Sequence, residues 1–131
     1  MSRATLSEVF ADLKAAAIVT GRFEGAGAAT PTYPVANPPG WTATYTSTGI
    51  YRIHFTDAYS ALISAWSSLG GTTPANLAGH TLIWDDYVAK SGNTLAYREV
   101  SVYNASFALH DLVATEFVEF GFVFQNTSVR R

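Results

Sequence analysis

The period of the hydrophobic pattern changes near residue 17. Before this point the apolar residues recur at i, i+3, i+4 and i+7, which is typical of one face of a helix. Thr5 and Glu8 have capping-box spacing at the start of this segment. The apolar positions are Leu6, Val9, Phe10 and Leu13. The pattern predicts an N-terminal helix or arm over residues 1–16, followed by a β domain over residues 17–131.

Beyond residue 17 the sequence alternates with the period of two that indicates strands. Gly, Pro, Ser and Asn cluster between the alternating runs, as they do in turns. We predict strands over residues 18–24, 41–46, 49–56, 61–66, 81–89, 94–103 and 116–125.

Two of these runs make specific predictions about burial. In the last run, one face consists only of Val118, Phe120, Phe122 and Phe124, so we expect a buried strand in the centre of a sheet. The run at residues 61–66 is short and apolar throughout, which predicts a strand buried on both faces. Seven or eight short strands separated by turns predict an all-β fold, an antiparallel jelly-roll sandwich in one domain.

A long proline-rich segment over residues 25–40 interrupts the strands. Each proline removes a backbone donor and fixes φ, so we expect an extended surface loop. Loops of this length tend to be functional or to be ordered by a partner. Residues 67–79, which include Gly70 and Gly71, form a second predicted loop.

Composition narrows the function classes. The net charge is −2 and the eight basic residues are scattered, which argues against nucleic-acid binding. No apolar run approaches the length of a membrane span, and no signal-peptide core precedes the domain. Charged residues make up only 14% of the chain, against about 25% in a typical soluble domain. We therefore expect part of the surface to be apolar and covered by other chains.

From the types and spacing of its reactive residues, we predict no active site, no cofactor and no metal. Cysteine is absent, and the three histidines lie far apart in sequence. His80 with Asp85 or Asp86 has no further ligand at metal-like spacing. No serine in a nucleophile-elbow context accompanies the His110 and Asp111 pair. We predict that the chain is not an enzyme.

The aromatic residues leave a binding function open. Loop aromatics such as Trp41 and Trp84 would stack on sugars if they were exposed, although oligomer interfaces and sandwich cores use the same residues more often. A small metal enzyme of the cupin type is a third alternative, because cupins are jelly rolls too.

A family resemblance adds to this interpretation. Residues 48–55, Thr-Gly-Ile-Tyr-Arg-Ile-His-Phe, resemble the G-x-Y-x-(V/I)-x-F strand of jelly-roll domains in phage virion proteins. The aromatic strand at residues 117–124 is similar to the closing strand of those domains, and of complement and tumour-necrosis-factor-like jelly rolls. The resemblance covers roughly residues 17–127.

The resemblance implies a structural protein of a tailed phage virion. In its standalone form this is a capsid cement or decoration subunit on the capsid surface, made in the host cytoplasm and contacting the major capsid protein. A homotrimer is expected first and a dimer second. The alternative is a receptor- or carbohydrate-binding head of a tail fibre. The expected partner interface consists of Leu6, Val9, Phe10, Leu13, Tyr33, Pro34 and Trp41.

Overall fold

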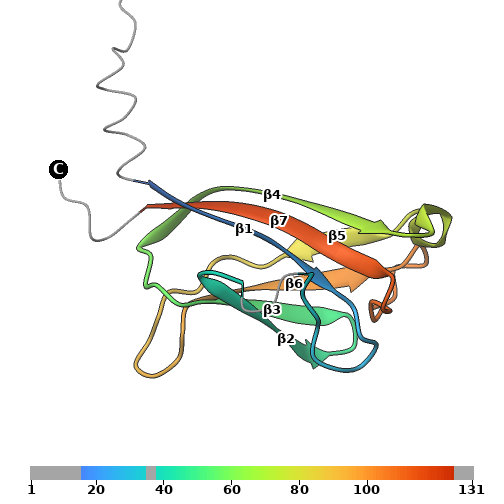
Figure 1. Ribbon diagram of the computed structural model, residues 1–131, viewed down its shortest axis with the longest axis horizontal. Helices are drawn as coiled ribbons and strands as arrows, with labels where there is room; N and C mark the ends of the chain where they lie inside the picture. Colours follow the sequence, from blue (N-terminus) through green and yellow to red (C-terminus); the bar gives the residue numbers. More distant parts are fainter. Residues whose placement is uncertain (1–15, 35–37, 126–131) are drawn as a thin grey trace, which may run out of the picture.

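The computed structural model describes residues 16–34 and 38–125, which form two antiparallel sheets packed face to face (Figure 1). The strands are β1 (Ala16–Glu24), β2 (Trp41–Ser47), β3 (Ile50–Phe55), β4 (Ala61–Gly71), β5 (Thr81–Trp84), β6 (Tyr97–Tyr103) and β7 (Glu116–Gln125). One short 3₁₀ helix, η1 (Pro74–Leu77), follows β4. The predicted all-β antiparallel sandwich is confirmed. The predicted arm lies almost wholly in residues 1–15, outside the described residues, and Ala16 already belongs to β1.

The sheets have the strand orders β1-β7-β4 and β2-β3-β6-β5. The chain passes from one sheet to the other after β1, β3, β4 and β6, so strands distant in sequence become neighbours. The first and last strands pair along their whole length, from Ala16 opposite Gln125 to Glu24 opposite Phe117. This arrangement is jelly-roll-like.

β7 has the central place that its alternation predicts. Its inward side chains Val118, Phe122 and Phe124 are fully buried, because the neighbouring strands and the second sheet both cover them. Phe55 of β3 packs on them from the other sheet, with its ring centroid 5.7 Å from that of Phe122 and 4.9 Å from that of Phe124. The core is therefore largely a stack of aromatic rings between the sheets.

The proline-rich segment lies against the sandwich at several points. Glu24 and Thr32 form a backbone bridge. The Tyr33 hydroxyl accepts a hydrogen bond from the Ala43 backbone N–H at 2.8 Å. Tyr33 also packs edge-on against the ring of Trp41, at a centroid distance of 5.2 Å. These contacts fix the described part of the loop to β2.

Two predicted strand boundaries are wrong by five residues, and the strand predicted from residue 94 begins at Tyr97. β4 continues through residues 67–71, which were expected to be a loop, because these residues pair with residues 116–120 of β7. At Gly70 the ring of Phe117 occupies the space that a side chain would need. The run expected over residues 81–89 ends at Trp84. There the Asp86 carboxylate accepts the Tyr87 backbone N–H at 2.8 Å, a local bond that competes with strand pairing.

The expected burial of β4 on both faces is also wrong. β4 is an edge strand, and its residues 63–68 are exposed. Ile63 is 61% exposed and Trp66 is 54% exposed. An apolar run is compatible with a central strand or with an edge that another molecule covers, and the sequence alone does not separate them.

Candidate functional site

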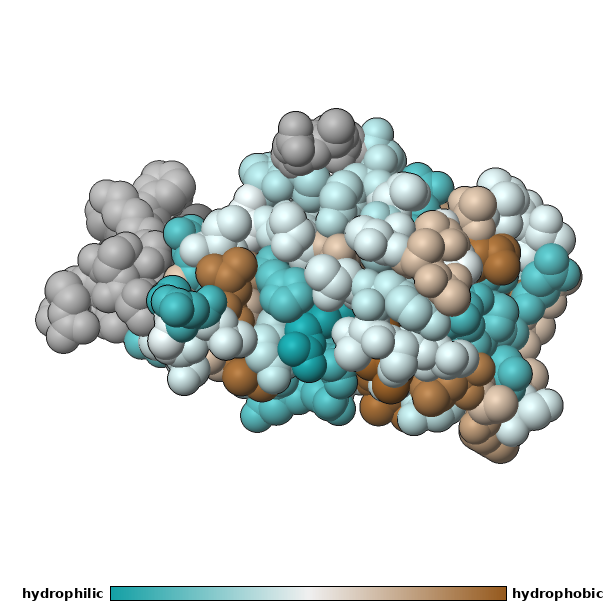
Figure 2. All heavy atoms as spheres, turned by 90° about the horizontal axis from the view of Figure 1, so that it is seen from below, coloured by the Kyte–Doolittle hydropathy of each residue, from teal (hydrophilic) through white to brown (hydrophobic). Residues whose placement is uncertain are grey.

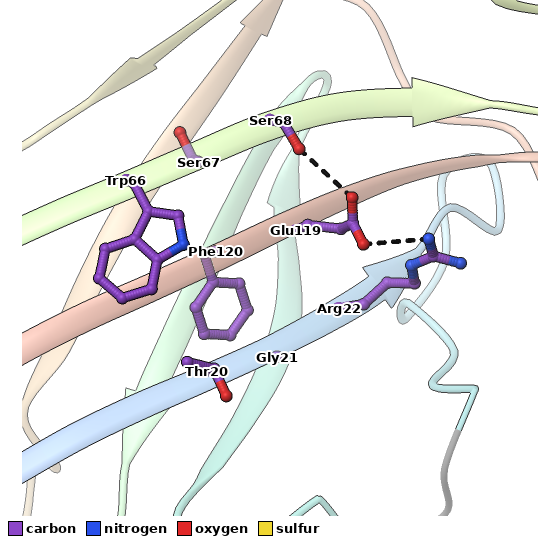
Figure 3. A pocket seen from close by; sticks show the side chains of 8 residues that line it. All are labelled: Thr20, Gly21, Arg22, Trp66, Ser67, Ser68, Glu119 and Phe120. Atoms are coloured by element: carbon purple, nitrogen blue, oxygen red, sulfur yellow. Dashed lines mark hydrogen bonds and ion pairs between the residues drawn. The ribbon is translucent and has the colours of Figure 1, made fainter.

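The outer face of the β1-β7-β4 sheet carries an exposed tryptophan on a glycine. Trp66 of β4 is paired with Gly121 of β7, which is paired in turn with Thr20 of β1. The indole lies on the Gly121 backbone, in the space that a side chain there would occupy (Figure 3). One face of the ring rests on β7, and the residue remains 54% exposed, so the other face is open to solvent.

One row along the same face, an ion pair and a hydrogen bond to its carboxylate connect the three strands. Arg22 Nη2 donates to Glu119 Oε2 at 3.1 Å, and Ser68 Oγ donates to Glu119 Oε1 at 3.3 Å (Figure 3). The Arg22 guanidinium also lies over the ring of Phe117, with its carbon 3.6 Å from the ring centroid. Two contacts on the neighbouring strand β7 therefore hold this guanidinium in place.

Between the tryptophan and the ion pair lies an open depression of about 540 Å³. This volume is within the range of roughly 300–1,000 Å³ that small-molecule sites have. The depression combines a flat apolar surface with hydroxyl, guanidinium and carboxylate groups at its rim, an arrangement suited to binding. Its lining residues are Thr20, Gly21, Arg22, Trp66, Ser67, Ser68, Glu119 and Phe120.

A second candidate surface is the free edge of β4. This strand has 11 residues, none of them charged and none a proline. Proteins usually protect long edge strands with charges, prolines or a covering segment. The other edge of the same sheet, β1, carries Arg22 and Glu24. The two edges of one sheet are thus protected to different degrees.

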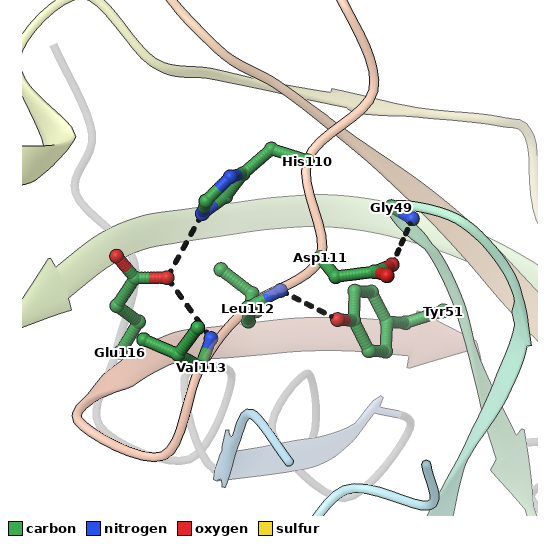
Figure 4. Close-up of polar contacts among 7 residues, drawn as sticks. All are labelled: Gly49, Tyr51, His110, Asp111, Leu112, Val113 and Glu116. Atoms are coloured by element: carbon green, nitrogen blue, oxygen red, sulfur yellow. Dashed lines mark hydrogen bonds and ion pairs between the residues drawn. The ribbon is translucent and has the colours of Figure 1, made fainter. Parts of the chain in front are cut away.

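At the end of the sandwich where β7 begins, a group of polar contacts holds residues 110–116 (Figure 4). The Tyr51 hydroxyl accepts the Leu112 backbone N–H at 2.8 Å, and the Asp111 carboxylate accepts the Gly49 N–H at 2.7 Å. Burial raises the pKa of Tyr51 to about 12. Gly49 has a φ of +68°, as the predicted turn before β3 requires. These bonds attach the segment to the β2-β3 turn.

His110, which adjoins Asp111 in the sequence, has Glu116 as its partner. His110 Nε2 lies 2.9 Å from Glu116 Oε1, which also accepts the Val113 backbone N–H at 3.0 Å (Figure 4). The ring of His80 contacts that of His110 at a centroid distance of 4.7 Å. In residues 16–34 and 38–125, no group of three or more His, Asp or Glu side chains is arranged to hold a metal ion. The interactions of Glu116 are those of a buried structural carboxylate.

The residues predicted for the partner interface are only partly placed. Trp41 is 2% exposed and lies in the core against Phe120, so its predicted role as a partner contact is wrong. Gly21 provides the space that the Trp41 indole occupies inside the sandwich. Tyr33 is half-buried and Pro34 is exposed. Four further predicted positions lie outside the described residues, namely Leu6, Val9, Phe10 and Leu13.

The structure also changes the choice of aromatic residues for ligand stacking. Trp84 is half-buried: its Nε1 donates to Ser67 Oγ at 2.9 Å and its ring contacts Phe122. The exposed ring is that of Trp66, which the sequence placed on a buried strand. The sequence signal for this site is a tryptophan that faces a glycine, Trp66 opposite Gly121. The two residues are brought together only by the β4–β7 register, which the sequence did not reveal.

The comparisons with known proteins identify no relative. No family model, curated protein or solved structure matches the chain. Among the described residues, no helix has the length and apolar character needed to cross a membrane.

Proposed function

We propose that this chain is a structural subunit that assembles with copies of itself, in the form of a capsid cement or decoration protein of a tailed phage. The jelly-roll-like sandwich supports this proposal, as does the resemblance of residues 48–55 and 117–124 to virion jelly-roll domains. The low content of charged residues, 14%, is in keeping with a surface partly covered in an assembly.

The observation that carries the proposal is the long, uncharged, exposed edge of β4. Its outer backbone groups offer a ladder of donors and acceptors to another strand. A second copy that pairs there would remove the edge from solvent. A charged or proline-containing edge would oppose such pairing, and β4 has neither.

Exposed apolar side chains on β4 and on the opposite edge strand of the sheet, β1, support the same interpretation. Ile63 at the bulge of β4 is 61% exposed, and Ile18 of β1 is 59% exposed. Both lie toward the end of the sheet where β1 begins and β7 ends. Burial of such side chains between copies contributes about 1.5–3 kcal/mol for each one fully covered.

A homotrimer is the preferred assembly and a dimer the second choice, with the major capsid protein as the external partner. Several weak contacts made at once give a high total affinity, which suits a subunit that holds neighbouring capsid proteins together. In this scheme the apolar stripe within residues 1–14 contributes the grip on the capsid.

The oligomeric state of the purified full chain tests the assembly. Sedimentation or mass photometry at micromolar concentration should give one defined oligomer. Ser64→Lys, which adds a charge to the exposed middle of β4, should shift it toward monomer. Thr42→Lys on the exposed side of the edge strand β2 is the matched control and should leave the oligomer unchanged. A wild-type protein that is purely monomeric contradicts the proposal.

The capsid role has a separate test. The open reading frames beside the gene should include a major capsid protein, and the chain should bind particles assembled from it. A chain that lacks residues 1–14 should keep its fold and lose particle binding. Undiminished binding by the shortened chain rules out the grip assigned to this segment.

A further inference from the structure

We propose that the depression beside Trp66 is a carbohydrate-binding site that takes a neutral hexopyranose. Four features on the outer face of the β1-β7-β4 sheet carry this inference: an open aromatic face, a fixed Arg–Glu pair, hydroxyl groups at the rim and the absence of net charge in the lining. The inference goes beyond the assembly function and does not depend on it. The β4 edge lies in the plane of the sheet, whereas this site lies on its face.

The aromatic part of the site is formed before any ligand arrives. Gly121 lets the indole of Trp66 lie on the β7 backbone, so the ring does not have to be ordered on binding. Its free face is a flat apolar surface. A pyranose ring has C–H groups on its faces and hydroxyls around its edge, so it can place its apolar face on the indole.

The polar part of the site matches the edge of a sugar. Hydroxyl groups both donate and accept hydrogen bonds, and the rim offers donors from Arg22 and acceptors from Glu119. Ser68 adds a hydroxyl on the same side. Within the described part of the chain, the Nε1 of Trp66 makes no hydrogen bond and is a further donor.

The charge of the site selects the ligand class. Arg22 and Glu119 form an ion pair, and the other described residues that line the depression are uncharged. A phosphate, sulfate or uronic acid that approached Arg22, the cation of the site, would also meet the carboxylate of Glu119. An apolar peptide side chain would stack on Trp66 but would remove water from the ion pair. It would offer no hydrogen bonds in place of those that the water had made. A neutral sugar satisfies both halves of the site.

The test follows the indole N–H signal of Trp66 by NMR in the full-length ¹⁵N-labelled protein. The probes are the methyl glycosides of β-glucose, β-galactose and α-mannose, each added to roughly 100 mM because a single sugar ring is expected to bind with a Kd on the order of millimolar. At least one glycoside should shift the Trp66 signal in a saturable manner. The signals of Trp41 and Trp84, which are buried and half-buried, should move less.

Three variants sharpen the test. Trp66→Ala should weaken binding at least tenfold, and Trp66→Phe should weaken it less. In these variants, which lack the Trp66 indole, binding is measured by the shifts of the backbone amide signals around Glu119. Gly121→Ala should also weaken binding, because its Cβ would push the indole off β7 while the exposed ring has room to move. Phe107→Ala is the control: it removes another exposed aromatic ring, 86% exposed, and should leave the affinity unchanged.

The opposite results are equally clear. The proposal is overturned if no glycoside moves the Trp66 signal, or if Trp66→Ala binds as well as the wild type. It is also overturned if the Trp66 signal responds to protein dilution and not to sugar, since the face would then be a contact between copies. Neither result bears on the β4 edge, which Ser64→Lys tests separately.

Discussion

The outer faces of the two sheets contain the same kind of ion pair. On the β1-β7-β4 sheet Arg22 pairs with Glu119 at 3.1 Å, and on the β2-β3-β6-β5 sheet Arg52 pairs with Glu99 at 3.0 Å. Both pairs join directly opposite residues of neighbouring antiparallel strands. An Arg–Glu pair on a sheet therefore does not by itself distinguish a binding face from a structural one.

The difference lies in the aromatic rings beside each pair. Arg52 lies over Tyr97, with its guanidinium carbon 3.9 Å from the ring centroid, and so covers that ring. On the other sheet Arg22 covers Phe117 in the same way, but Trp66 remains as an additional ring that lies on Gly121. Figure 2 shows the β2-β3-β6-β5 side, where hydrophilic and neutral residues cover most of the surface and hydrophobic ones form small separate groups. The two outer faces thus differ because Gly121 of β7 makes room for the additional ring of Trp66.

Both faces depend on one core, and loosening that core should have the largest effect. Tyr51→Phe removes the hydroxyl that accepts the Leu112 N–H and leaves this buried donor without its partner. We expect the free energy of unfolding to fall by about 2 kcal/mol, measured by urea denaturation. Tyr45→Phe, a half-buried neighbour, is the control and should cost less than about 0.5 kcal/mol. Equal losses in the two variants would contradict the role given to the Tyr51 hydroxyl.

The two ion pairs should differ in their contribution to stability. Arg52 donates twice to Glu99, at 3.2 and 3.0 Å, and the Glu99 side chain is 20% exposed, whereas that of Glu119 is 49% exposed. We expect Glu99→Gln to lower the free energy of unfolding by about 1 kcal/mol and Glu119→Gln by about 0.3 kcal/mol. Paired urea denaturation curves with equal slopes measure this difference. The reverse order would show that exposure does not govern these pairs.

The smallest expected effect is a pH dependence on the β2-β3-β6-β5 face. Burial, and secondarily the charge of Arg52, lower the pKa of His54 below its usual value of 6.5. The folded state therefore takes up this proton less readily than the unfolded state, and stability is lost as the pH falls through 6.5 toward the lowered pKa. His54→Asn should reduce this loss. Melting temperatures of both proteins at several pH values give the difference, and identical pH profiles would contradict it.

The sequence predicted the parts of the fold that one strand decides alone. The unbroken apolar face from Val118 to Phe124 predicted a buried strand with a neighbour on each side, and β7 lies between β1 and β4 as expected. The strand predicted over residues 49–56 is likewise present as β3, and the alternating residues Tyr51, Ile53 and Phe55 form its buried face. In both strands the side-chain pattern contains the whole physical reason for the outcome.

The parts that failed depend on the position of another strand. The run of β4 is apolar whether it is central or at an edge, and only the arrangement of the sheet placed it at the edge. Trp41 and Trp66 are equally apolar in sequence, but Gly21 accommodates the first inside the sandwich and Gly121 the second outside. The packing of the two sheets decided the first outcome and the β4–β7 register decided the second. One sequence contains neither of them in readable form.

The pairing of Ala16 with Gln125 has a mechanical consequence. β1 and β7 run antiparallel, so a force that pulls these two residues apart acts on the ladder at one end. The hydrogen bonds between the strands then break one after another, as in a zipper, instead of sharing the load. A tension applied between Ala16 and Gln125 should peel β1 away at low force, whereas a tension applied between Ala16 and Phe117, at opposite ends of the two strands, would shear the whole ladder at once.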